Sequence, residues 1–210
     1  MSSPTTLILI RHGAVHNPQQ VYYGRLPAFR LSAEGQRQAE AAARVLWELP
    51  VTCIYSSPLL RARQTAACLA QGGAGIRPIH LTRLLHEVHT PYDGYPQTEL
   101  NRQNWNLYAH ALPGYEQPEA VLARARRFVR RILSRHAGQM VAAVSHGDVI
   151  AFTLLWARRA PLSVPDRQQL RRLGFPDDYP ATASLAFLRF ESGGDLTARL
   201  PSHMAYIKPY

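Results

Sequence analysis

The sequence predicts an α/β protein of three layers: a mostly parallel central sheet with helices on both faces, plus a small lid insertion. Short apolar runs alternate with segments of helical periodicity, an order that is typical of parallel sheets. The chain has 210 residues, of which 46% are hydrophobic and 18% charged. This composition indicates a globular fold with a full core. Because neither a repeat nor a linker-like segment interrupts the sequence, we expect a single domain over residues 1–210.

The first part of the sequence predicts two buried strands, each followed by a helix. Residues 5–10 (TTLILI) are apolar and partly β-branched, which favours a buried strand. A helix is expected over residues 32–47, because Ser32 suits the N-cap position and small residues behind it allow close packing. Residues 51–55 (VTCIY) predict the second strand, and Pro58 fits the first turn of the helix that follows.

The middle of the sequence predicts an edge strand, the lid and a long helix. Residues 76–80 predict a third strand, at an edge of the sheet because Pro78 cannot donate a ladder hydrogen bond. Residues 88–118 are rich in Pro, Gly, Tyr, His and Asn, and we expect a lid or substrate wall there with one helix near residues 99–108. A clear amphipathic pattern predicts a helix over residues 119–136.

The last part of the sequence predicts three more strands and an apolar helix. Residues 140–144 (MVAAV) are expected to form a buried strand, and the helix after it ends near Trp156. Two further strands, at residues 184–190 and 196–200, are expected to complete the sheet.

Basic residues clearly outnumber acidic ones. Lys and Arg total 24 and Asp and Glu 14, which gives a net charge of +10 and an isoelectric point near 10.2. Such a balance suits anionic ligands, such as phosphate esters or nucleic acid. One face of the predicted amphipathic helix carries Arg124, Arg127, Arg131 and Arg135. A stripe of this kind can bind nucleic acid, but it is more often a solvated face, and we adopt the second interpretation.

Cysteine usage and hydropathy predict a cytoplasmic protein. Cys53 and Cys68 fall in an apolar and a helical segment, so we expect buried thiols in a reducing compartment. The sequence contains no apolar stretch near the roughly 20 residues that span a bilayer. Its N-terminus lacks the basic and apolar regions of a secretory signal. We therefore expect no membrane partner.

Two His-Gly dipeptides follow two of the predicted strands. Arg11-His12-Gly13 comes directly after the first strand, and Ser145-His146-Gly147 follows the strand at residues 140–144. Ligands of open α/β sheets bind outside the carboxyl ends of the strands. If these two strands are neighbours, both histidines face one crevice, and each glycine lets the backbone approach a ligand closely.

An arginine and a carboxyl group are expected at the same crevice. Arg61 lies one turn into the helix after the second strand, where it can bind a phosphate with two hydrogen bonds, whereas Arg63 is expected on the exposed face. Glu87 follows the third strand and can act as a proton donor. We predict no metal site, because the spacing at residues 86–89 (HEVH) is not that of a His-Glu-x-x-His motif.

Together these motifs resemble the histidine phosphatase superfamily, and more narrowly its phosphoglycerate-mutase-like branch. They occur in the family's order within residues 7–150. The matching segments are Arg11-His12-Gly13, residues 31–35, residues 56–66, Glu87 before Tyr92-Asp93-Gly94, and Ser145-His146-Gly147. The resemblance implies an α/β sandwich and a phosphohistidine intermediate, formed without a metal ion or another cofactor.

The resemblance also implies a role for each matching residue. His12 would accept the phosphoryl group as the nucleophile. Arg11 and Arg61 would hold the phosphate oxygens, and His146 would stabilise the transferring group. Glu87 would act as the general acid that protonates the departing oxygen.

Three further residues are candidates for substrate binding. Asn17 resembles a phosphate-contacting Asn of the family, although it follows Arg11 by six residues where the mutases have seven. Gly147 opens a helix whose free N–H groups can bind an anion. Arg25 lies in a segment, residues 22–27, that is expected at the rim of the crevice.

The sequence therefore predicts a metal-independent phosphatase that hydrolyses small phosphorylated metabolites through phosphohistidine. A cofactor-dependent phosphoglycerate mutase is the alternative within the enzyme class, but the insertion is short for the closed site that a mutase needs. A basic RNA- or anion-binding protein on the same scaffold is the second alternative. The complete set of site residues argues against this second alternative, so we do not expect a nucleic-acid partner.

Overall fold

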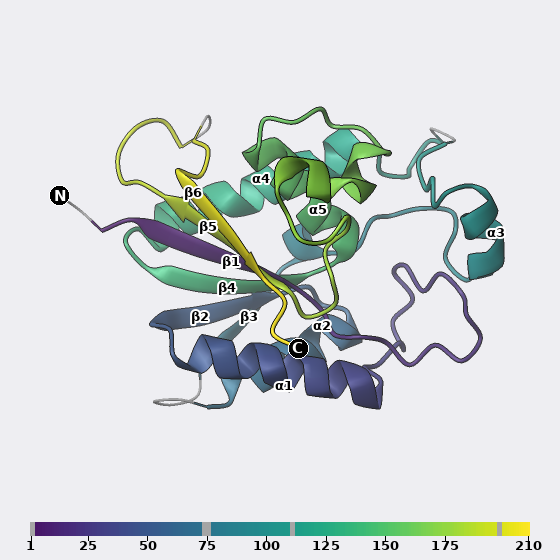
Figure 1. Cartoon of the computed structure of the whole chain (residues 1–210), viewed down its shortest axis with the longest axis horizontal. Coiled ribbons are helices and arrows are strands. Elements are labelled where there is room, and N and C mark those ends of the chain that lie inside the picture. Colours follow the sequence, from purple (N-terminus) through teal and green to yellow (C-terminus); the bar gives the residue numbers. More distant parts are fainter. Residues whose placement is uncertain (1–2, 73–76, 110–111, 197–198) are drawn as a thin grey trace.

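The computed structural model describes residues 3–72, 77–109, 112–196 and 199–210. In this part of the chain a single sheet has the strand order β3-β2-β4-β1-β5-β6 (Figure 1). The strands β1 to β4 run parallel, while β5 is antiparallel to β1 and β6 to β5. The prediction of a mostly parallel sheet is confirmed. The bounds of the strands are β1 Thr5–Arg11, β2 Val51–Ser56, β3 Ile79–Leu81, β4 Met140–Ser145, β5 Leu185–Phe190 and β6 His203–Ile207.

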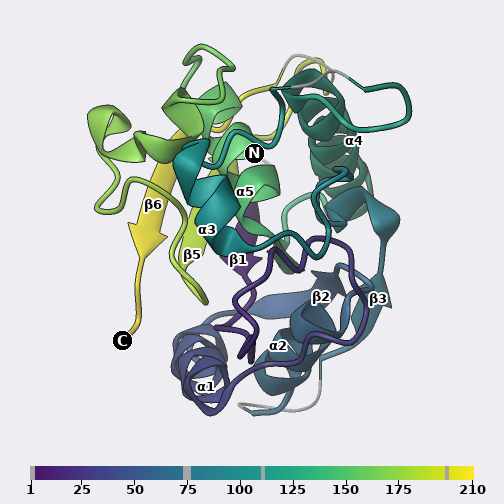
Figure 2. The same ribbon diagram turned by 90° about the vertical axis from the view of Figure 1, so that its right-hand side faces the viewer.

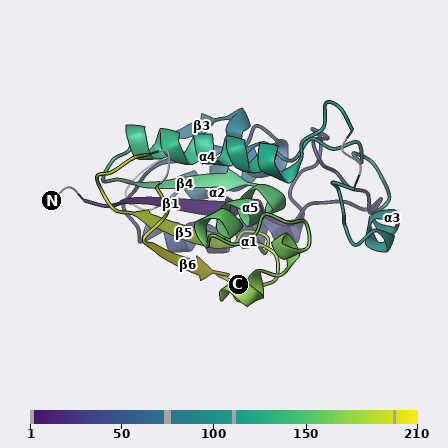
Figure 3. The same cartoon turned by 90° about the horizontal axis from the view of Figure 1, so that it is seen from above.

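Helices cover both faces of the sheet and complete the three predicted layers. Figures 2 and 3 show α1 and α2 on one face and α4 and α5 on the other. The helix bounds are α1 Ala33–Trp47, α2 Leu60–Ala70, α3 Gln97–Arg102, α4 Pro118–Arg135 and α5 Gly147–Ala157. Short 3-10 turns are η1 Arg83–Leu85, η2 Asp166–Gln168 and η3 Leu170–Leu173. Within the described part of the chain, the helices are too short or too polar to span a bilayer.

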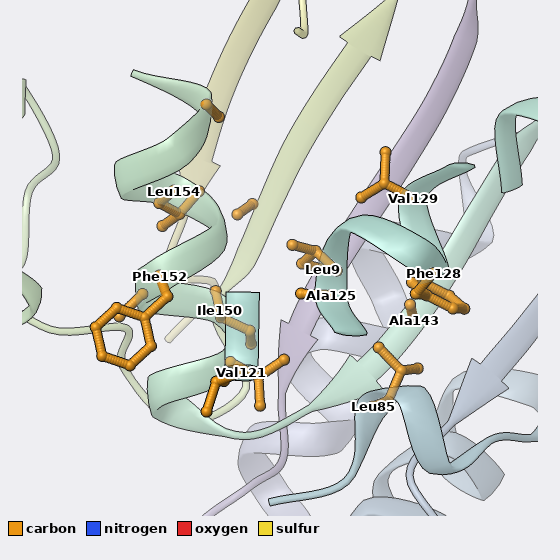
Figure 4. Packing of buried hydrophobic residues seen from close by; sticks show 14 of the residues in the cluster. Leu9, Leu85, Val121, Ala125, Phe128, Val129, Ala143, Ile150, Phe152 and Leu154 are labelled. Carbon is orange, nitrogen blue, oxygen red and sulfur yellow. The ribbon is translucent and has the colours of Figure 1, made fainter. Parts of the chain in front are cut away.

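The central strand β1 is buried on both faces because its side chains alternate between two cores. Leu7 and Leu9 belong to the core under α4 and α5, whereas Ile8 and Ile10 pack with α1 and α2. Figure 4 shows Leu9 close to Ala125 and other residues of the first core. A strand buried in this way reads as a continuous apolar run rather than an alternating one.

Local signals at the helix ends are confirmed for α1 but not for α2. The Ser32 hydroxyl accepts a hydrogen bond from Gly35 N at 3.0 Å, so Ser32 is the N-cap of α1 as predicted. The prediction that Pro58 lies in the first turn of α2 is wrong. The helix begins at Leu60 with Leu59 as its N-cap, so the proline lies in the preceding turn.

Three predicted elements have different bounds. The edge position of β3 is confirmed, but this strand covers Ile79–Leu81, and the expected residue 76 lies outside the described residues. The helix of the insertion, α3, covers Gln97–Arg102, so it begins and ends earlier than the expected residues 99–108. The expected strand at residues 196–200 is wrong: Leu196 lies in a turn, residues 197–198 are outside the described part, and β6 forms at His203–Ile207.

Two predictions about burial also need correction. Cys53 is buried as expected, but Cys68 is only half-buried on α2. On α4 the outer arginines Arg127 and Arg131 are exposed, as a solvated face requires. Arg124 is instead buried, because its guanidinium group pairs with Glu116 at 2.6 Å.

Two segments project beyond the carboxyl ends of β1 and β4 and are joined to each other (Figure 1). They are the loop at residues 12–31 and the insertion at residues 88–117. Tyr22 N donates to Tyr95 O at 2.7 Å, and Gly94 N donates to Tyr22 O at 2.7 Å. The insertion also packs into the core under α4 and α5 through Tyr92, Leu100, Leu107 and Tyr108.

Candidate active site

The two predicted His-Gly dipeptides meet at one crevice, because β1 and β4 are neighbours in the sheet. Arg11 pairs with Ser145 in the strand register, and His12 N donates to Ser145 O at 3.1 Å. The rings of His12 and His146 lie edge to face with centroids 5.2 Å apart, and both are buried. We call these two residues, together with Arg11, Arg61 and Glu87, the histidine cluster.

His12 has its Nε2 atom free of a proton. Its Nδ1 lies 2.8 Å from the carbonyl oxygen of Gly13, which can only accept, so Nδ1 carries the proton. Nε2 accepts a hydrogen bond from Arg61 Nε at 3.1 Å. Burial lowers the pKa of His12 well below its usual 6.5, and the charges of Arg61 and Arg11 lower it further. The imidazole is therefore neutral, with a lone pair on Nε2.

Gly13 holds this imidazole close to the start of α1. A Cβ atom at Gly13 would lie 2.3 Å from the carbonyl oxygen of Gly35, and one at Gly35 would lie 1.9 Å from that of Ala14. Both positions therefore require glycine for close backbone approach. Gly13 N also donates to Thr65 Oγ1 at 3.1 Å, which ties β1 to α2.

Arg61 is fully buried at the start of α2, whereas Arg63 is exposed, as the sequence predicts. Arg61 Nη2 donates to Gly24 O at 2.6 Å, and the Arg61 guanidinium carbon lies 4.6 Å from the Tyr23 ring centroid. Its Nη1 is buried and has no hydrogen-bond partner among the described residues.

Arg11 supplies a second buried donor of this kind. Its Nη1 donates to Pro180 O at 2.7 Å, and the guanidinium carbon lies 5.1 Å from the Tyr179 ring centroid. In the described part of the chain its Nε has no hydrogen-bond partner. Buried donors are almost always satisfied in folded proteins, so the free donors of Arg11 and Arg61 call for an acceptor from a ligand.

His146 is held by α2 and by the turn before that helix. Its Nδ1 lies 3.3 Å from Arg61 Nη2, and because a guanidinium group can only donate, Nδ1 is the accepting nitrogen. The proton is therefore on Nε2, which donates to Ser57 Oγ at 2.8 Å. Burial lowers the pKa of His146 well below 6.5, and Arg61 adds to this effect.

Glu87 reaches the cluster from the chain segment after η1. Its Oε2 lies 3.4 Å from His146 Nδ1 and 3.7 Å from Arg61 Nη2, and its Oε1 accepts from Val88 N at 2.9 Å. Burial raises the pKa of the carboxyl group above its usual 4.5, although Arg61 opposes this shift. A buried carboxyl group with a raised pKa is suited to donate a proton.

A partly buried ion cluster of Arg25, Glu116 and Arg124 fixes the backbone of Glu87. Glu116 accepts from Arg25 Nη2 at 2.8 Å and from Arg124 Nε at 2.6 Å. Both arginines also donate to the carbonyl oxygen of Glu87, at 2.8 Å from Arg25 Nε and 3.3 Å from Arg124 Nη2. This ion cluster is a feature that the sequence analysis missed.

Two predicted substrate contacts have other partners in the structure. The Arg25 guanidinium group belongs to the ion cluster and does not line the cavity described below. Asn17 binds within its own loop: its Nδ2 donates to Val21 O at 2.8 Å, and its Oδ1 accepts from Val21 N at 3.2 Å. A direct substrate contact of either residue stays a prediction.

A cavity of about 460 Å³ opens beside the histidine cluster. Arg11 and Glu87 belong to the cluster and also line this cavity. Gly147 also lines it, at the N-terminus of α5, where a Cβ atom would lie 2.1 Å from the Tyr179 hydroxyl oxygen. The remaining wall includes Tyr22, Tyr23, Gln97, Trp105, Leu107, Asp148, Arg167, Gln168, Asp178 and Tyr179. Tyr22 and Tyr23 lie in the segment expected at the rim, and Gln97, Trp105 and Leu107 lie in the segment expected to form a substrate wall. The residues from Arg167 to Tyr179 were not predicted, because their segment has no recognisable motif.

The histidine cluster also offers three potential metal ligands. His12, Glu87 and His146 each offer one ligand atom, and these three atoms lie within 4.8 Å of one another. The guanidinium group of Arg61 lies 3.1 to 3.7 Å from atoms of all three residues, and its charge disfavours a cation there. The absence of a metal from the reaction remains a prediction.

The fold and the cluster together define an α/β protein in which two histidines and two arginines meet in one crevice at the carboxyl ends of β1 and β4. Residues 7–194 match the family described as the histidine phosphatase superfamily (branch 1). Because this match covers most of the chain, the protein belongs to that superfamily. The resemblance inferred from the sequence motifs is thereby confirmed.

Similar proteins include named phosphatases. The uncharacterized protein Rv0525 of Mycobacterium tuberculosis is 47% identical over 70 residues, which are 33% of this chain and 35% of that protein. The fructose-2,6-bisphosphatase TIGAR of Xenopus tropicalis is 31% identical over 130 residues, 58% of this chain and 47% of that protein. The chain thus spans less than half the length of these two relatives. The native structure of mycobacterial glucosyl-3-phosphoglycerate phosphatase Rv2419c has a TM-score of 0.74 at 25% identity, covering 97% of both chains.

Proposed function

We propose that this protein hydrolyses phosphomonoesters of small metabolites through a phosphohistidine at His12. The observation that carries the proposal is the environment of His12 Nε2. This atom is an unprotonated nitrogen beside Arg61, and within the described part of the chain Arg61 Nη1 and Arg11 Nε are buried donors without partners. A phosphoryl group supplies the missing acceptors, and phosphoryl transfer depends mainly on positioning and on neutralising charge on the oxygens. Membership in the histidine phosphatase superfamily supports the same chemistry.

The reaction would run in two steps. In the first, His12 Nε2 forms a bond to phosphorus while the bond from phosphorus to the leaving oxygen breaks. Glu87 gives its proton to that oxygen, and Arg11 and Arg61 stabilise the charge on the phosphoryl oxygens. In the second step Glu87, now a carboxylate, takes a proton from water. This proton transfer restores the acid form of Glu87, and the hydroxide displaces His12 from phosphorus, which releases inorganic phosphate.

The covalent step is tested by trapping. Brief incubation with radiolabelled p-nitrophenyl phosphate, followed by denaturation, should leave acid-labile, base-stable label on the wild-type protein and on His16→Ala, a matched control at an exposed histidine. His12→Ala should lose both label and turnover. Label that persists in His12→Ala would overturn the assignment. The same experiment in EDTA should give unchanged labelling, and a loss that a divalent ion restores would contradict the metal-free step.

A further inference from the structure

We propose that Arg167 and Asp148 form a leaving-group subsite, which accepts a neutral, hydroxyl-rich group and disfavours a second negative charge. The inference rests on the proposed function and names the class of phosphate ester that the cavity would take. Arg167 lies on η2 and is 2% exposed, and Asp148 lies in the first turn of α5. Both line the cavity beside the histidine cluster.

The Asp148 carboxylate is fixed by two tyrosines. Its Oδ2 accepts from the Tyr108 hydroxyl at 2.6 Å, and its Oδ1 accepts from the Tyr179 hydroxyl at 2.7 Å. Burial raises the pKa of both phenols well above 10, so both remain protonated donors. Arg167 Nε lies 3.5 Å from Asp148 Oδ1, close enough for an ion pair. The two tyrosines and the arginine therefore hold one negative charge in a defined position.

Arg167 retains a donor for a ligand. Its Nη2 donates to the carbonyl oxygen of Trp105, which anchors the insertion against η2. Its Nε is buried and has no hydrogen-bond partner among the residues that the structure describes. Unlike the free donors of Arg11 and Arg61, this atom also lies 3.5 Å from a carboxylate oxygen, Asp148 Oδ1, in an ion pair that lacks hydrogen-bond geometry. An oxygen of the leaving group would satisfy the Arg167 donor.

The charge balance argues against a second anion. Outside the histidine cluster, the charged residues that line the described cavity are Arg167, Asp148 and Asp178. Asp148 neutralises Arg167, and Asp178 forms its own pair with Arg171 at 3.7 Å near the surface. A carboxylate or second phosphate on the leaving group would therefore lose its hydration without meeting a net positive charge.

The other lining residues suit a hydroxylated ring. Tyr22, Trp105 and Tyr179 provide aromatic walls, and Gln97 and Gln168 provide amide donors and acceptors. Tyr22 and Trp105 lie edge to face with centroids 6.4 Å apart. A sugar ring combines apolar C–H faces with hydroxyl edges, so it matches walls of this kind. Such a ring can come from a sugar phosphate or from the ribose of a nucleotide.

Two substrates that differ in one charge test the proposal on the wild-type protein. Glycerol 3-phosphate and 3-phosphoglycerate differ only by a CH₂OH group in place of a carboxylate. The wild type should have a kcat/KM at least tenfold higher for glycerol 3-phosphate, the size expected when a charged group loses its hydrogen bonds. An equal or higher value for 3-phosphoglycerate would overturn the proposal. Glucose 6-phosphate and AMP, assayed in parallel, distinguish the two sources of the ring.

Asp148→Asn provides a readout that a purely structural role would not move. The amide keeps the shape and one acceptor oxygen but leaves the charge of Arg167 uncompensated. The ratio of kcat/KM for 3-phosphoglycerate to that for glycerol 3-phosphate should rise about 10- to 100-fold. The control is Asp166→Asn, which removes a charge on η2 next to Arg167 but outside the cavity lining. It should leave this ratio unchanged. Equal losses on both substrates in Asp148→Asn would overturn the proposal in favour of a structural role.

These experiments distinguish a failure of the proposed function from a failure of the leaving-group subsite. If the wild type hydrolyses none of these esters and takes no label at His12, the phosphatase assignment fails. If it hydrolyses them with the opposite charge preference, only the leaving-group subsite fails.

Discussion

Replacing Glu87 by Gln tests its proposed role as the general acid directly. The change removes the acidic proton and alters the volume of the side chain very little. The side chain is buried, with Oε2 3.4 Å from His146 Nδ1 and 3.7 Å from Arg61 Nη2. Burial raises the pKa of the carboxyl group above 4.5, against the opposing charge of Arg61. Glu87 therefore keeps its proton to higher pH than an exposed glutamate does.

The size of the effect depends on the leaving group. General acid catalysis contributes about 10²–10⁴-fold when the leaving oxygen needs a proton in the transition state. An alkoxide needs one, whereas p-nitrophenolate leaves readily without it. Glu87→Gln should therefore lower kcat/KM by about 10²–10⁴-fold on glycerol 3-phosphate and by far less on p-nitrophenyl phosphate.

The pH profile of kcat/KM gives a second measurement on the same variant. The proposed mechanism uses Glu87 in its acid form, so the wild-type rate on glycerol 3-phosphate should fall as pH rises through the raised pKa of Glu87. His12 must be neutral to attack. Its pKa is lowered well below 6.5 by burial and by the charges of Arg61 and Arg11, so protonation of His12 should reduce the rate only well below pH 6.5. Glu87→Gln should lose the high-pH decline and keep the low-pH one. The ionisation of the substrate is common to both proteins and cancels in the comparison.

Glu119→Gln is the matched control, because Glu119 is exposed in the first turn of α4. It should behave as the wild type on both substrates. Equal losses on both substrates in Glu87→Gln would show that Glu87 shapes the pocket without donating a proton. No loss on either would place it outside the reaction, and each of these results would refute the assignment.

Three further substitutions test the phosphate contact, the ion cluster and the helix cap. Arg61→Ala should lower kcat/KM about 10- to 150-fold by removing a charge-assisted contact, whereas steady-state kinetics of Arg63→Ala should show almost no change. Glu116→Gln should lower kcat more on glycerol 3-phosphate than on p-nitrophenyl phosphate, because it loosens the arginines that hold the Glu87 carbonyl; a uniform loss would speak against positioning. Ser32→Ala should lower the free energy of unfolding by about 1 kcal/mol in urea titrations, with kcat/KM unchanged.

The strand-end part of the site could be predicted from the sequence because local patterns determine it. A buried strand followed by His-Gly places an imidazole at the carboxyl end of the sheet, and two such strands need only be neighbours. The observed pairing of β1 with β4 meets that condition. Arg61 could be placed for the same reason, since helical spacing alone separates its buried position from the exposed position of Arg63.

The ion cluster and the leaving-group subsite could not be predicted, because their partners are distant in sequence and lie in segments without periodicity. Arg25 meets Glu116 across 91 residues, and Arg167 meets the carbonyl of Trp105 across 62. An arginine in an aperiodic segment gives no sign of whether it will be solvated or buried. The same limit explains the error at Arg124, where helical spacing indicated a solvated face and the insertion supplied a half-buried carboxylate, that of Glu116.

The arginines described above fall into two groups, according to whether a carboxylate group neutralises them. Arg124 and Arg167 each have a carboxylate oxygen within 3.5 Å, so their charges are largely neutralised within the protein. Among the described residues, Arg11 has no carboxyl group within 4 Å. Arg61 has one within that distance, Glu87, and the raised pKa of Glu87 favours its uncharged form. Positive charge is thus left uncompensated around the unprotonated His12 Nε2 and is balanced where the leaving group would lie. That distribution favours a single phosphoryl group at one end of the cavity and an uncharged group at the other.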